Sequence, residues 1–423
     1  MSSKNIIMRL RLLLTTQGIL KTILKAFRAG GIYFSYKVRR KLSGNLYKNQ
    51  LMELETRISE HQGFVDLFYA HIGWNTPGFQ RYQQISLQSS QMGGLVIYGG
   101  HPTLDDKILV YQEVKKNLYV LNKKDSEITR RIFRALARLD QPRIARIESI
   151  DLVTSMEEIK DLMHQGFKIV YEYIDEISME ISGHVPDFVY HRHKALLKDE
   201  QVIVVATSDQ LFENVQRHRS ENMILSTNGV DIDHWRIPKK EPPHDLKAAL
   251  TGRIIVGYHG ALAKWVDYDL LQMIADEGSY ELLLIGYEHD NQFSRSGIRY
   301  HPRVHFLGSK SYFDLNSYST YYDVAILPFL KNRLTEAVSP IKIFEYMAAL
   351  KPIVTSDLHE CKKYKSCLIA KDKREFMLQL ASAAERRKDS NYLQILDTEA
   401  GQNTWRNKTT EVLKLAGINH TPI

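Results

Sequence analysis

The sequence predicts an α/β protein with two doubly wound domains that face a cleft, preceded by a basic amphipathic helical segment. The chain has 423 residues, of which 43% are hydrophobic and 10% aromatic, and this suits two or three packed domains. Strand and helix patterns alternate from about Phe64 onward, which is typical of mostly parallel sheets. One strand–loop–helix–strand unit, at residues 323–355, has the features of an anion-binding corner.

That corner centres on a helix predicted to begin at Ser339. Ser339 is the expected N-cap, and Pro340 suits the first helical position, where its missing N–H costs nothing. The N–H groups from Ile341 onward have no partner inside the helix and point outward with the positive end of the helix dipole. Lys342 adds a cation in the first turn, which is unfavourable there unless an anion binds. We therefore predict a phosphate site at this helix start.

Glu345 lies one turn after Ile341, on the same side of the predicted helix. A carboxylate accepts charge-assisted hydrogen bonds from the hydroxyls of a sugar or ribose. A phosphate site beside a hydroxyl-binding carboxylate indicates a phosphorylated sugar or a nucleotide. The alternative is a well-capped core helix that holds no ligand, because Ser-Pro helix starts are common.

Short apolar runs mark the expected strands. In the first half they lie at residues 64–71, 95–98, 118–121, 167–173, 202–206 and 223–226, and in the second half at 254–258, 281–285, 304–307, 323–327, 352–355 and 366–369. We expect a basic segment over 1–52, a first domain over 62–230, a second over 231–400 and a C-terminal helical segment over 401–423.

Residues 1–52 differ from the rest because they hold eleven Lys and Arg residues and no Asp or Glu. The net charge of the whole chain is +8, so the remainder is slightly acidic. Apolar residues recur at helical spacing in this segment, at Leu10, Leu13, Leu14, Ile19, Leu20, Ile23, Leu24 and Phe27. This pattern predicts helices that lie on an anionic membrane surface. The alternative is a helix packed on its own protein or on a partner. Nucleic acid is not expected, since no stacking aromatics interleave the charges.

Other sequence features favour a cytoplasmic protein on the inner face of the plasma membrane. No apolar stretch is followed by a small-residue cleavage site, so no signal peptide is expected. The two cysteines, Cys361 and Cys367, are too few for a disulfide framework and lack the second pair of a zinc site.

Several segments, in order, resemble the GT-B glycosyltransferases of the group 1, family-4-like branch, and in particular the teichuronic-acid-type transferases of bacterial surface polysaccharides. The resemblance covers about residues 66–406 and is carried by residues 227–231 (TNGVD), 257–262 (GYHGAL), 304–308 (VHFLG), 323–328 (DVAILP) and 339–354 (SPIKIFEYMAALKPIV). It implies two Rossmann-like domains, with a closing helix near 404–416 that returns to the first.

The resemblance implies a donor site for a nucleotide diphosphate sugar on the second domain, with no metal needed for the chemistry. The implied donor-binding residues are Gly260, Lys264, Leu307, Ser339, Pro340, Ile341, Lys342 and Glu345, with Arg333 as a further candidate for the diphosphate. Two departures from the family pattern stand out. Ala337 occupies the position of a first glutamate, with Glu336 one residue out of register, and the loop at 260–265 carries Lys264 without the usual arginine.

On the first domain the resemblance implies an acceptor site and a catalytic carboxylate. Asp175 follows a buried strand at the sheet edge where ligands bind, and it is expected to act on an acceptor hydroxyl together with Glu345 as the second catalytic residue. The alternative for Asp175 is a helix cap. Trp74 is a candidate sugar platform or loop anchor, and Arg81 is a candidate for holding an acceptor phosphate or carboxylate.

Together these features predict a glycosyltransferase that moves a sugar from a nucleotide diphosphate sugar to a hydroxyl of a lipid-linked or cell-surface glycan. Two alternatives stay open. The missing Glu and Arg motivate a non-enzymatic partner subunit that stabilises an active partner glycosyltransferase, and the shared architecture allows a sugar-nucleotide epimerase.

Overall fold

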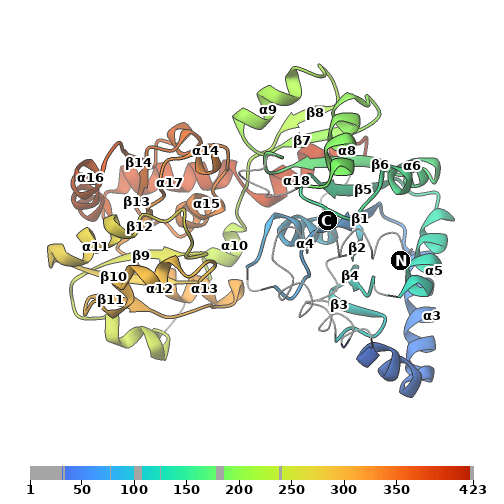
Figure 1. The fold of residues 1–423 in the computed structure, drawn as a ribbon, viewed down its shortest axis with the longest axis horizontal. Coiled ribbons are helices and arrows are strands. Elements are labelled where there is room, and N and C mark those ends of the chain that lie inside the picture. The colour runs from blue at the N-terminus through green and yellow to red at the C-terminus, as the bar shows by residue number, and fades with distance from the viewer. Residues whose placement is uncertain are drawn as a thin grey trace. The chain divides into compact units, whose positions relative to one another are not determined.

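The computed structural model describes residues 31, 34–76, 78–99, 107–123, 125–177, 185–237 and 241–419 (Figure 1). These residues form two compact units. The first unit holds the described residues of Met1–Thr76, Arg81–Leu225 and Thr409–Ile423, and the second holds those of Pro77–Gln80 and Ser226–Lys408. The predicted fold class is confirmed, since each unit is a Rossmann-like α/β domain built on its own sheet.

The first unit contains an eight-stranded sheet in the order β3-β4-β2-β1-β5-β6-β7-β8. All neighbours are parallel except β3 and β4. Its strands are β1 (Val65–Tyr69), β2 (Leu95–Gly99), β3 (Tyr111–Lys115), β4 (Leu118–Leu121), β5 (Arg143–Glu148), β6 (Lys168–Tyr173), β7 (Ile203–Ala206) and β8 (Met223–Leu225). The strand order turns back between β1 and β5, the place where doubly wound sheets bind ligands.

Helices cover both faces of this sheet, which explains why most of its strands are buried. They are α3 (Gly44–Glu60), α4 (Arg81–Gln91), α5 (Ser126–Ala137), α6 (Met156–His164), α8 (Asp187–Lys198), α9 (Asp209–Gln216) and the later part of α18 (Trp405–Leu415). Side chains of α3 and α5 share a core with one face, whereas Val412 and Leu413 of α18 pack on Ile144 and Val170 of the other.

The central strand β5 was absent from the predicted strands because its sequence, Arg-Ile-Ala-Arg-Ile-Glu, carries three charges. The structure places one of the three, Arg146, in a buried ion-pair network. Arg146 donates to Asp66 at 2.9 Å and to Glu172 at 2.8 Å, and Arg81 donates to the other oxygen of Glu172 at 3.0 Å. Arg146, Asp66 and Glu172 are all fully buried, so the charges of three adjacent strands compensate one another inside the core.

The second unit contains a six-stranded parallel sheet in the order β11-β10-β9-β12-β13-β14. Its strands are β9 (Ile254–His259), β10 (Tyr280–Ile285), β11 (Val304–Phe306), β12 (Val324–Leu327), β13 (Ile353–Ser356) and β14 (Cys367–Ala370). All six lie within two residues of the predicted ranges. The order turns back between β9 and β12.

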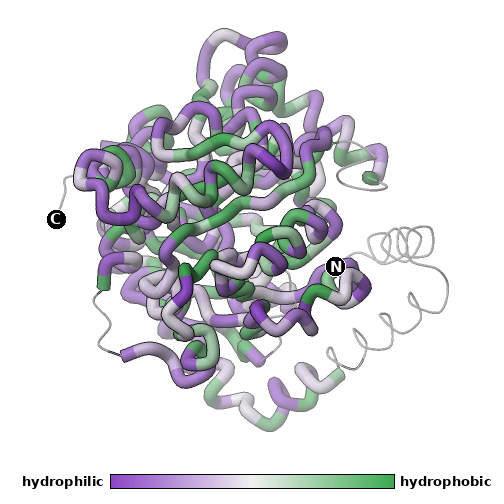
Figure 2. Tube along the Cα trace, turned by 90° about the vertical axis from the view of Figure 1, so that its left-hand side faces the viewer, coloured by the Kyte–Doolittle hydropathy of each residue, from purple (hydrophilic) through white to green (hydrophobic). Residues whose placement is uncertain are grey.

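Short and long helices connect these strands. They are α10 (Ile232–Trp235), η1 (His244–Ala249), α11 (Tyr268–Glu277), α12 (Gln292–Ser296), η2 (Ile298–Tyr300), α13 (Tyr312–Ser319), α14 (Arg333–Glu336), α15 (Ile341–Ala348), η3 (His359–Lys363), α16 (Lys373–Arg386) and α17 (Ser390–Gln402). Buried apolar side chains from the strands and helices form one core cluster. In Figure 2 green hydrophobic stretches alternate with purple ones along the helices, as expected for helices with one buried face.

The part of the basic segment from residue 34 onward packs on its own protein, as one of the two interpretations of this segment predicted. Residues 34–42 are helical, and Tyr36 donates a hydrogen bond to Asp125, the N-cap of α5, at 2.6 Å. Tyr47 and Leu51 of α3 are buried in the core of the first unit. The predicted amphipathic pattern from Leu10 to Phe27 lies outside the described residues. Among the described residues, none of the helices combines the length and apolarity needed to cross a membrane.

Candidate functional site

The predicted phosphate corner forms at the carboxyl edge of the sheet in the second unit. The helix α15 follows β12 through the short helix α14, next to the point where the strand order turns back. In doubly wound sheets this edge is where ligands bind, and a helix start there presents free N–H groups. The corner therefore has the local structure that the sequence predicts.

The cap of α15 differs from the prediction by one residue. Pro340 is the N-cap, with φ −74° and ψ 115°, and no side chain caps the helix. Ser339 instead faces the turn that opens this unit, where its Oγ accepts from the Asn228 N–H at 3.2 Å and its carbonyl accepts from Asn228 Nδ2 at 2.6 Å. The prediction of Ser339 as the cap was wrong because a tertiary contact takes its hydroxyl. The first N–H groups of α15 are consequently not occupied by a side-chain cap.

Lys342 lies in the first turn of α15 and packs against the loop after β9. A Cβ built on Gly260 would lie 1.9 Å from Lys342 Cε, so only glycine, with φ +144°, leaves room for this side chain. Within the described residues, Lys342 Nζ makes no hydrogen bond and no ion pair. Burial lowers the pKa of Lys342, and the nearby carboxylate of Glu345 opposes that shift. A half-buried cation without a partner beside a helix start fits an anion that neutralises it.

Glu345 is buried on the next turn of α15 and pairs with His259, the last residue of β9. Its Oε2 lies 2.8 Å from His259 Nε2. The ring of Trp235 stacks on His259 with centroids 5.4 Å apart, and the His259 N–H donates to the hydroxyl of Tyr346 at 3.2 Å. The other oxygen of Glu345 has no hydrogen-bond partner among the residues that the structure describes. It is therefore open to a hydroxyl.

The remaining predicted donor residues lie in loops at the same edge. Lys264 is exposed and its N–H donates to Asp290 at 2.8 Å, while the Leu307 N–H donates to the Leu284 carbonyl at 3.0 Å. Arg333 begins α14. Ala337, which stands where the family has a glutamate, is 1% exposed, and Glu336 has a buried Oε1 that forms no hydrogen bond with any residue that the structure describes. Thus Gly260, Lys342 and Glu345 come together, whereas Lys264 and Leu307 lie on separate loops.

A second group of polar side chains forms in the first unit, around Asp175. Asp175 follows β6, Glu148 ends β5 and His71 follows β1, and these strands are neighbours in the order β1-β5-β6. His71 and Asp175 line a cavity of about 250 Å³ together with Ser149, Ile150, Leu152, Ile177, Val185 and Val189. The lining combines apolar side chains with a few polar groups, which is the usual composition of a small-molecule site.

Electrostatics couple the groups in this cavity. Burial raises the pKa of Asp175, opposed by the charge of His71. Burial lowers the pKa of the His71 ring. The carboxylates of Glu148, Asp175 and Asp151 raise it, and together they outweigh the burial, so the pKa of the ring is raised. Glu148 Oε2 contacts His71 Nδ1 and accepts from the His71 N–H at 2.9 Å. Titratable groups that shift one another in a cavity are typical of functional sites.

Trp74 and Arg81 lie elsewhere in the first unit. Trp74 is 7% exposed, packs edge-on against Tyr98 and accepts from Gln83 at its carbonyl at 2.8 Å. Arg81 is 5% exposed and belongs to the buried ion-pair network. These contacts show that both side chains stabilise the fold of the first unit. Their roles toward an acceptor stay predictions.

Three residues of these sites were not recognised in the sequence: His71, Glu148 and His259. Each lies at or just after the carboxyl end of a strand, so strand ends were the available signal. Glu148 was hidden because β5 was not predicted. His71 and His259 were placed within or next to apolar runs, where a histidine alone indicates no role.

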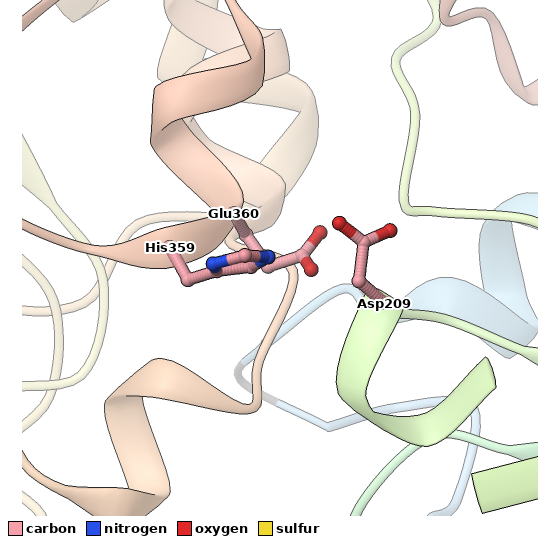
Figure 3. A group of neighbouring side chains, drawn as sticks. All are labelled: Asp209, His359 and Glu360. Carbon is pink, nitrogen blue, oxygen red and sulfur yellow. The ribbon is translucent and has the colours of Figure 1, made fainter. Parts of the chain in front are cut away.

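We assign no metal site to the three side chains drawn in Figure 3, because they belong to separate units. Asp209 is in the first turn of α9, while His359 and Glu360 begin η3. Within the second unit, Glu360 pairs with Lys363 at 2.8 Å.

Comparisons with known proteins agree with this architecture. Residues 253–385, all in the second unit, match the family described as Glycosyl transferases group 1. The chain is 21% identical over 267 residues to TuaH of Bacillus subtilis (strain 168), a protein assigned to teichuronic acid biosynthesis as a glycosyltransferase, and the match covers 59% of this chain and 67% of TuaH.

Two solved structures share the fold. Sucrose-phosphate synthase from Thermosynechococcus elongatus aligns with a TM-score of 0.59 at 16% identity, covering 84% of this chain and 98% of the other. Anabaena HepE in complex with UDP aligns with a TM-score of 0.56 at 16% identity, covering 84% and 100%. The predicted resemblance is confirmed: residues 253–385 match the group 1 glycosyltransferases, and the fold of the chain is GT-B.

Proposed function

We propose that this enzyme transfers a sugar from a UDP-sugar to a hydroxyl of a lipid-linked or cell-surface glycan. The observation that carries the proposal is Lys342, a cation without a partner at the start of α15 and against the Gly260 loop. The donor belongs to the second unit and the acceptor to the cavity that Asp175 lines in the first. The UDP complex of HepE and the assignment of TuaH to teichuronic acid biosynthesis support the donor and the acceptor class.

The chemistry requires stabilisation of the leaving diphosphate, because negative charge develops there as the glycosidic bond to phosphate breaks. The N–H groups at the start of α15 and the ammonium of Lys342 are fixed donors for that charge. Glu345, held by His259, offers its free oxygen to a hydroxyl of the sugar or ribose. Lys264 and Arg333 are further candidates for the diphosphate. No step in this scheme assigns work to a metal ion.

Thermal unfolding in the presence of nucleotides tests the donor assignment. UDP at a hundred times its Kd is expected to stabilise the second unit by about 2.7 kcal/mol, and uridine much less, because uridine lacks the charge that Lys342 neutralises. UMP and pyrophosphate give intermediate controls. A protein whose melting temperature responds equally to all four compounds, or to none, contradicts the assignment.

The helix at residues 34–42 supports attachment to an anionic membrane. Phe34, Val38 and Leu42 are spaced four residues apart on one face and are 69%, 42% and 82% exposed. A cavity of about 480 Å³ that this helix partly lines holds five basic side chains and one acidic one, Glu127; the basic ones are Lys37, Arg40, Lys41, Lys48 and Arg131. Exposed apolar side chains next to clustered cations match the acyl region and the headgroup phosphates of an anionic bilayer.

Substituting the apolar face tests this attachment. Replacing Phe34, Val38 and Leu42 with serine is expected to lower binding to phosphatidylglycerol-containing vesicles by at least about tenfold, because fully burying each such side chain contributes up to about 1.5–3 kcal/mol. Leu378→Ser is the matched control, since Leu378 is 67% exposed on α16 in the second unit. Vesicle binding by the triple variant that equals that of the control rules out this face. The fold is retained, because the substituted side chains are outside the core.

A further inference from the structure

We infer that His259 is a positioning residue of the donor site, which holds the carboxylate of Glu345 away from Lys342. The inference rests on the proposed function. By this arrangement Lys342 stays available to the diphosphate, and Glu345 stays available to a pair of neighbouring hydroxyls on the ribose or on the sugar. The observation that carries the inference is the contact between His259 Nε2 and Glu345 Oε2 at 2.8 Å.

Three aromatic side chains fix the ring of His259. Trp235 and Tyr322 stack on it, with ring centroids 5.4 and 6.2 Å away and interplanar angles of 18° and 30°. Tyr346 packs edge-on with its centroid 4.8 Å away, and its hydroxyl accepts from the His259 backbone N–H at 3.2 Å. All four residues are at most 4% exposed, so close packing holds the ring in one orientation.

The hydrogen bonds of the ring define its tautomer. The carboxylate of Glu345 only accepts, so Nε2 of His259 carries the proton. Nδ1 is buried and has no hydrogen-bond partner within the part of the chain that the structure describes. A proton on Nδ1 would be a buried donor without an acceptor, which is costly, so Nδ1 carries the lone pair. The ring therefore donates one hydrogen bond, and Glu345 receives it.

Packing alone does not require a histidine at this position. A phenylalanine ring would fill the space among Trp235, Tyr322 and Tyr346 without burying two nitrogens. A buried polar atom that is left unsatisfied, as Nδ1 is, calls for an explanation other than stability. The hydrogen bond from His259 to Glu345 provides that explanation.

The spacing of Lys342 and Glu345 on α15 shows what this hydrogen bond does. Side chains three residues apart lie next to each other on a helix, and opposite charges so placed attract. Burial lowers the pKa of Lys342 and the charge of Glu345 opposes that shift, so the two groups interact. The described residues nevertheless include no ion pair between them, because Oε2 of Glu345 is directed to His259.

Without the hydrogen bond from His259, the carboxylate is free to turn toward Lys342. The resulting ion pair would neutralise the cation that binds the diphosphate and would occupy the carboxylate that accepts the hydroxyls. Both parts of the ligand would bind more weakly, although Lys342 and Glu345 are unchanged. A second substitution, Glu345→Gln, removes the charge that pairs with Lys342 and should restore binding of the diphosphate part alone.

Calorimetric titration of the full chain with pyrophosphate tests this sequence of effects. His259→Phe is expected to raise the Kd of pyrophosphate by roughly tenfold, the scale of coupling between neighbouring side chains. The double variant His259→Phe/Glu345→Gln should bind pyrophosphate within about twofold of wild type. A double variant that binds as weakly as His259→Phe overturns the inference, since disturbed packing would affect both alike. An unchanged Kd in His259→Phe overturns it as well.

UDP and its 2′,3′-dideoxy form distinguish the two sources of hydroxyls. If Glu345 receives the ribose hydroxyls, wild type binds UDP more tightly than the dideoxy form, and the double variant loses this preference. If it receives the sugar hydroxyls, the preference lies between a UDP-sugar and UDP and is lost in the same way. A double variant that keeps the wild-type preference in both comparisons contradicts the role given to Glu345 and His259.

Two further measurements keep the test independent of the phenylalanine variant. His259→Gln, whose amide can donate to Glu345, should bind pyrophosphate nearly as wild type does. ¹⁵N NMR of the wild type, with the ring signals assigned by their loss in His259→Gln, should show the Nε2–H tautomer. The Nδ1–H tautomer overturns the inference.

His305→Phe is the matched control. His305 pairs with Glu281 at 2.7 Å, near the amino end of β10 in the same unit, so its replacement removes a similar pair away from α15. This variant should leave the Kd of pyrophosphate unchanged. An increase in Kd equal to that of His259→Phe would show a general loss of packing and reject the inference.

The outcomes distinguish this inference from the function on which it rests. A wild type that binds UDP and pyrophosphate, together with a His259→Phe variant that binds both equally well, rejects the inference and leaves the donor site in place. A wild type that binds neither compound rejects the donor site itself.

Discussion

Replacing Arg146 with methionine is expected to lower the stability of the first unit by about 3–5 kcal/mol, because the substitution leaves the buried Asp66 without its cation and Glu172 with Arg81 alone. Arg146 is fully buried between β1 and β6, and it donates to Asp66 at 2.9 Å and to Glu172 at 2.8 Å. The methionine fills much of the same volume, so the loss reports the unpaired charges rather than a cavity. Hydrogen exchange of the β5 amides measures it in this unit alone.

The matched control is Arg57→Met. Arg57 also contacts two carboxylates, Glu53 and Glu113, but all three side chains are about a third to a half exposed. An exposed ion pair contributes about 0–1 kcal/mol to stability, so the β5 amides of this variant should exchange hydrogen nearly as slowly as those of the wild type. Equal effects of the two substitutions would contradict the role given to the buried network.

The stability that Arg146→Met loses relative to wild type should depend on pH in a defined direction. Burial already raises the pKa of Asp66 and Arg146 opposes that shift, so without the arginine the pKa of Asp66 in the folded variant lies further above its value in the unfolded chain. The folded variant therefore binds more protons than the unfolded one, and its stability falls as pH rises through those values. The deficit relative to wild type should shrink on acidification. A deficit independent of pH would point to packing alone.

Replacing Lys342 with alanine is expected to raise the Kd of UDP by about ten- to a hundredfold. The helix start contributes roughly 0.3–2 kcal/mol to an anion, and a hydrogen bond to a charged group roughly 1.5–3 kcal/mol. Calorimetric titration with UDP, uridine and pyrophosphate measures the change. Uridine should bind almost equally to both proteins, since it lacks the diphosphate.

Two further variants sharpen that titration. Lys388→Ala removes an exposed cation from the same unit and should leave UDP binding within twofold, which excludes a general effect of net charge. Glu345→Gln should weaken ligands that bear ribose or sugar hydroxyls and spare pyrophosphate, because Glu345 is assigned to hydroxyls. If Lys342→Ala binds UDP as tightly as wild type, the donor site has been placed wrongly.

The sequence was informative where one local pattern determines the structure. The run from Asp323 to Thr355 encodes a strand, a helix with a cationic first turn and the next strand within one stretch, and all three form as expected. The cap at Ser339 was mispredicted because its hydroxyl is taken by Asn228, far away in the sequence. The local preference of a serine for a helix cap cannot indicate that a residue distant in the sequence will bind its hydroxyl.

The site in the first unit depends on strand pairing, which the chain does not display locally. The charged residues Arg143, Arg146 and Glu148 kept β5 from being predicted as a buried strand. In the fold, Asp66 and Glu172 on the flanking strands neutralise Arg146. With β5 missing, the ends of β1 and β6 had no common neighbour. Asp175 was therefore identified by itself, and its grouping with His71 became visible only in the structure.

Analysis of the products formed from UDP-sugars tests the central claim most directly. The full chain is incubated with a panel of UDP-sugars, with and without a membrane lipid extract, and both UDP and the fate of the sugar are followed. We predict UDP release with transfer of the sugar to the lipid-linked acceptor, reduced in Lys342→Ala. Recovery of an epimerised sugar nucleotide would contradict the account in favour of an epimerase, and unchanged UDP-sugars throughout the panel would favour a non-enzymatic partner subunit.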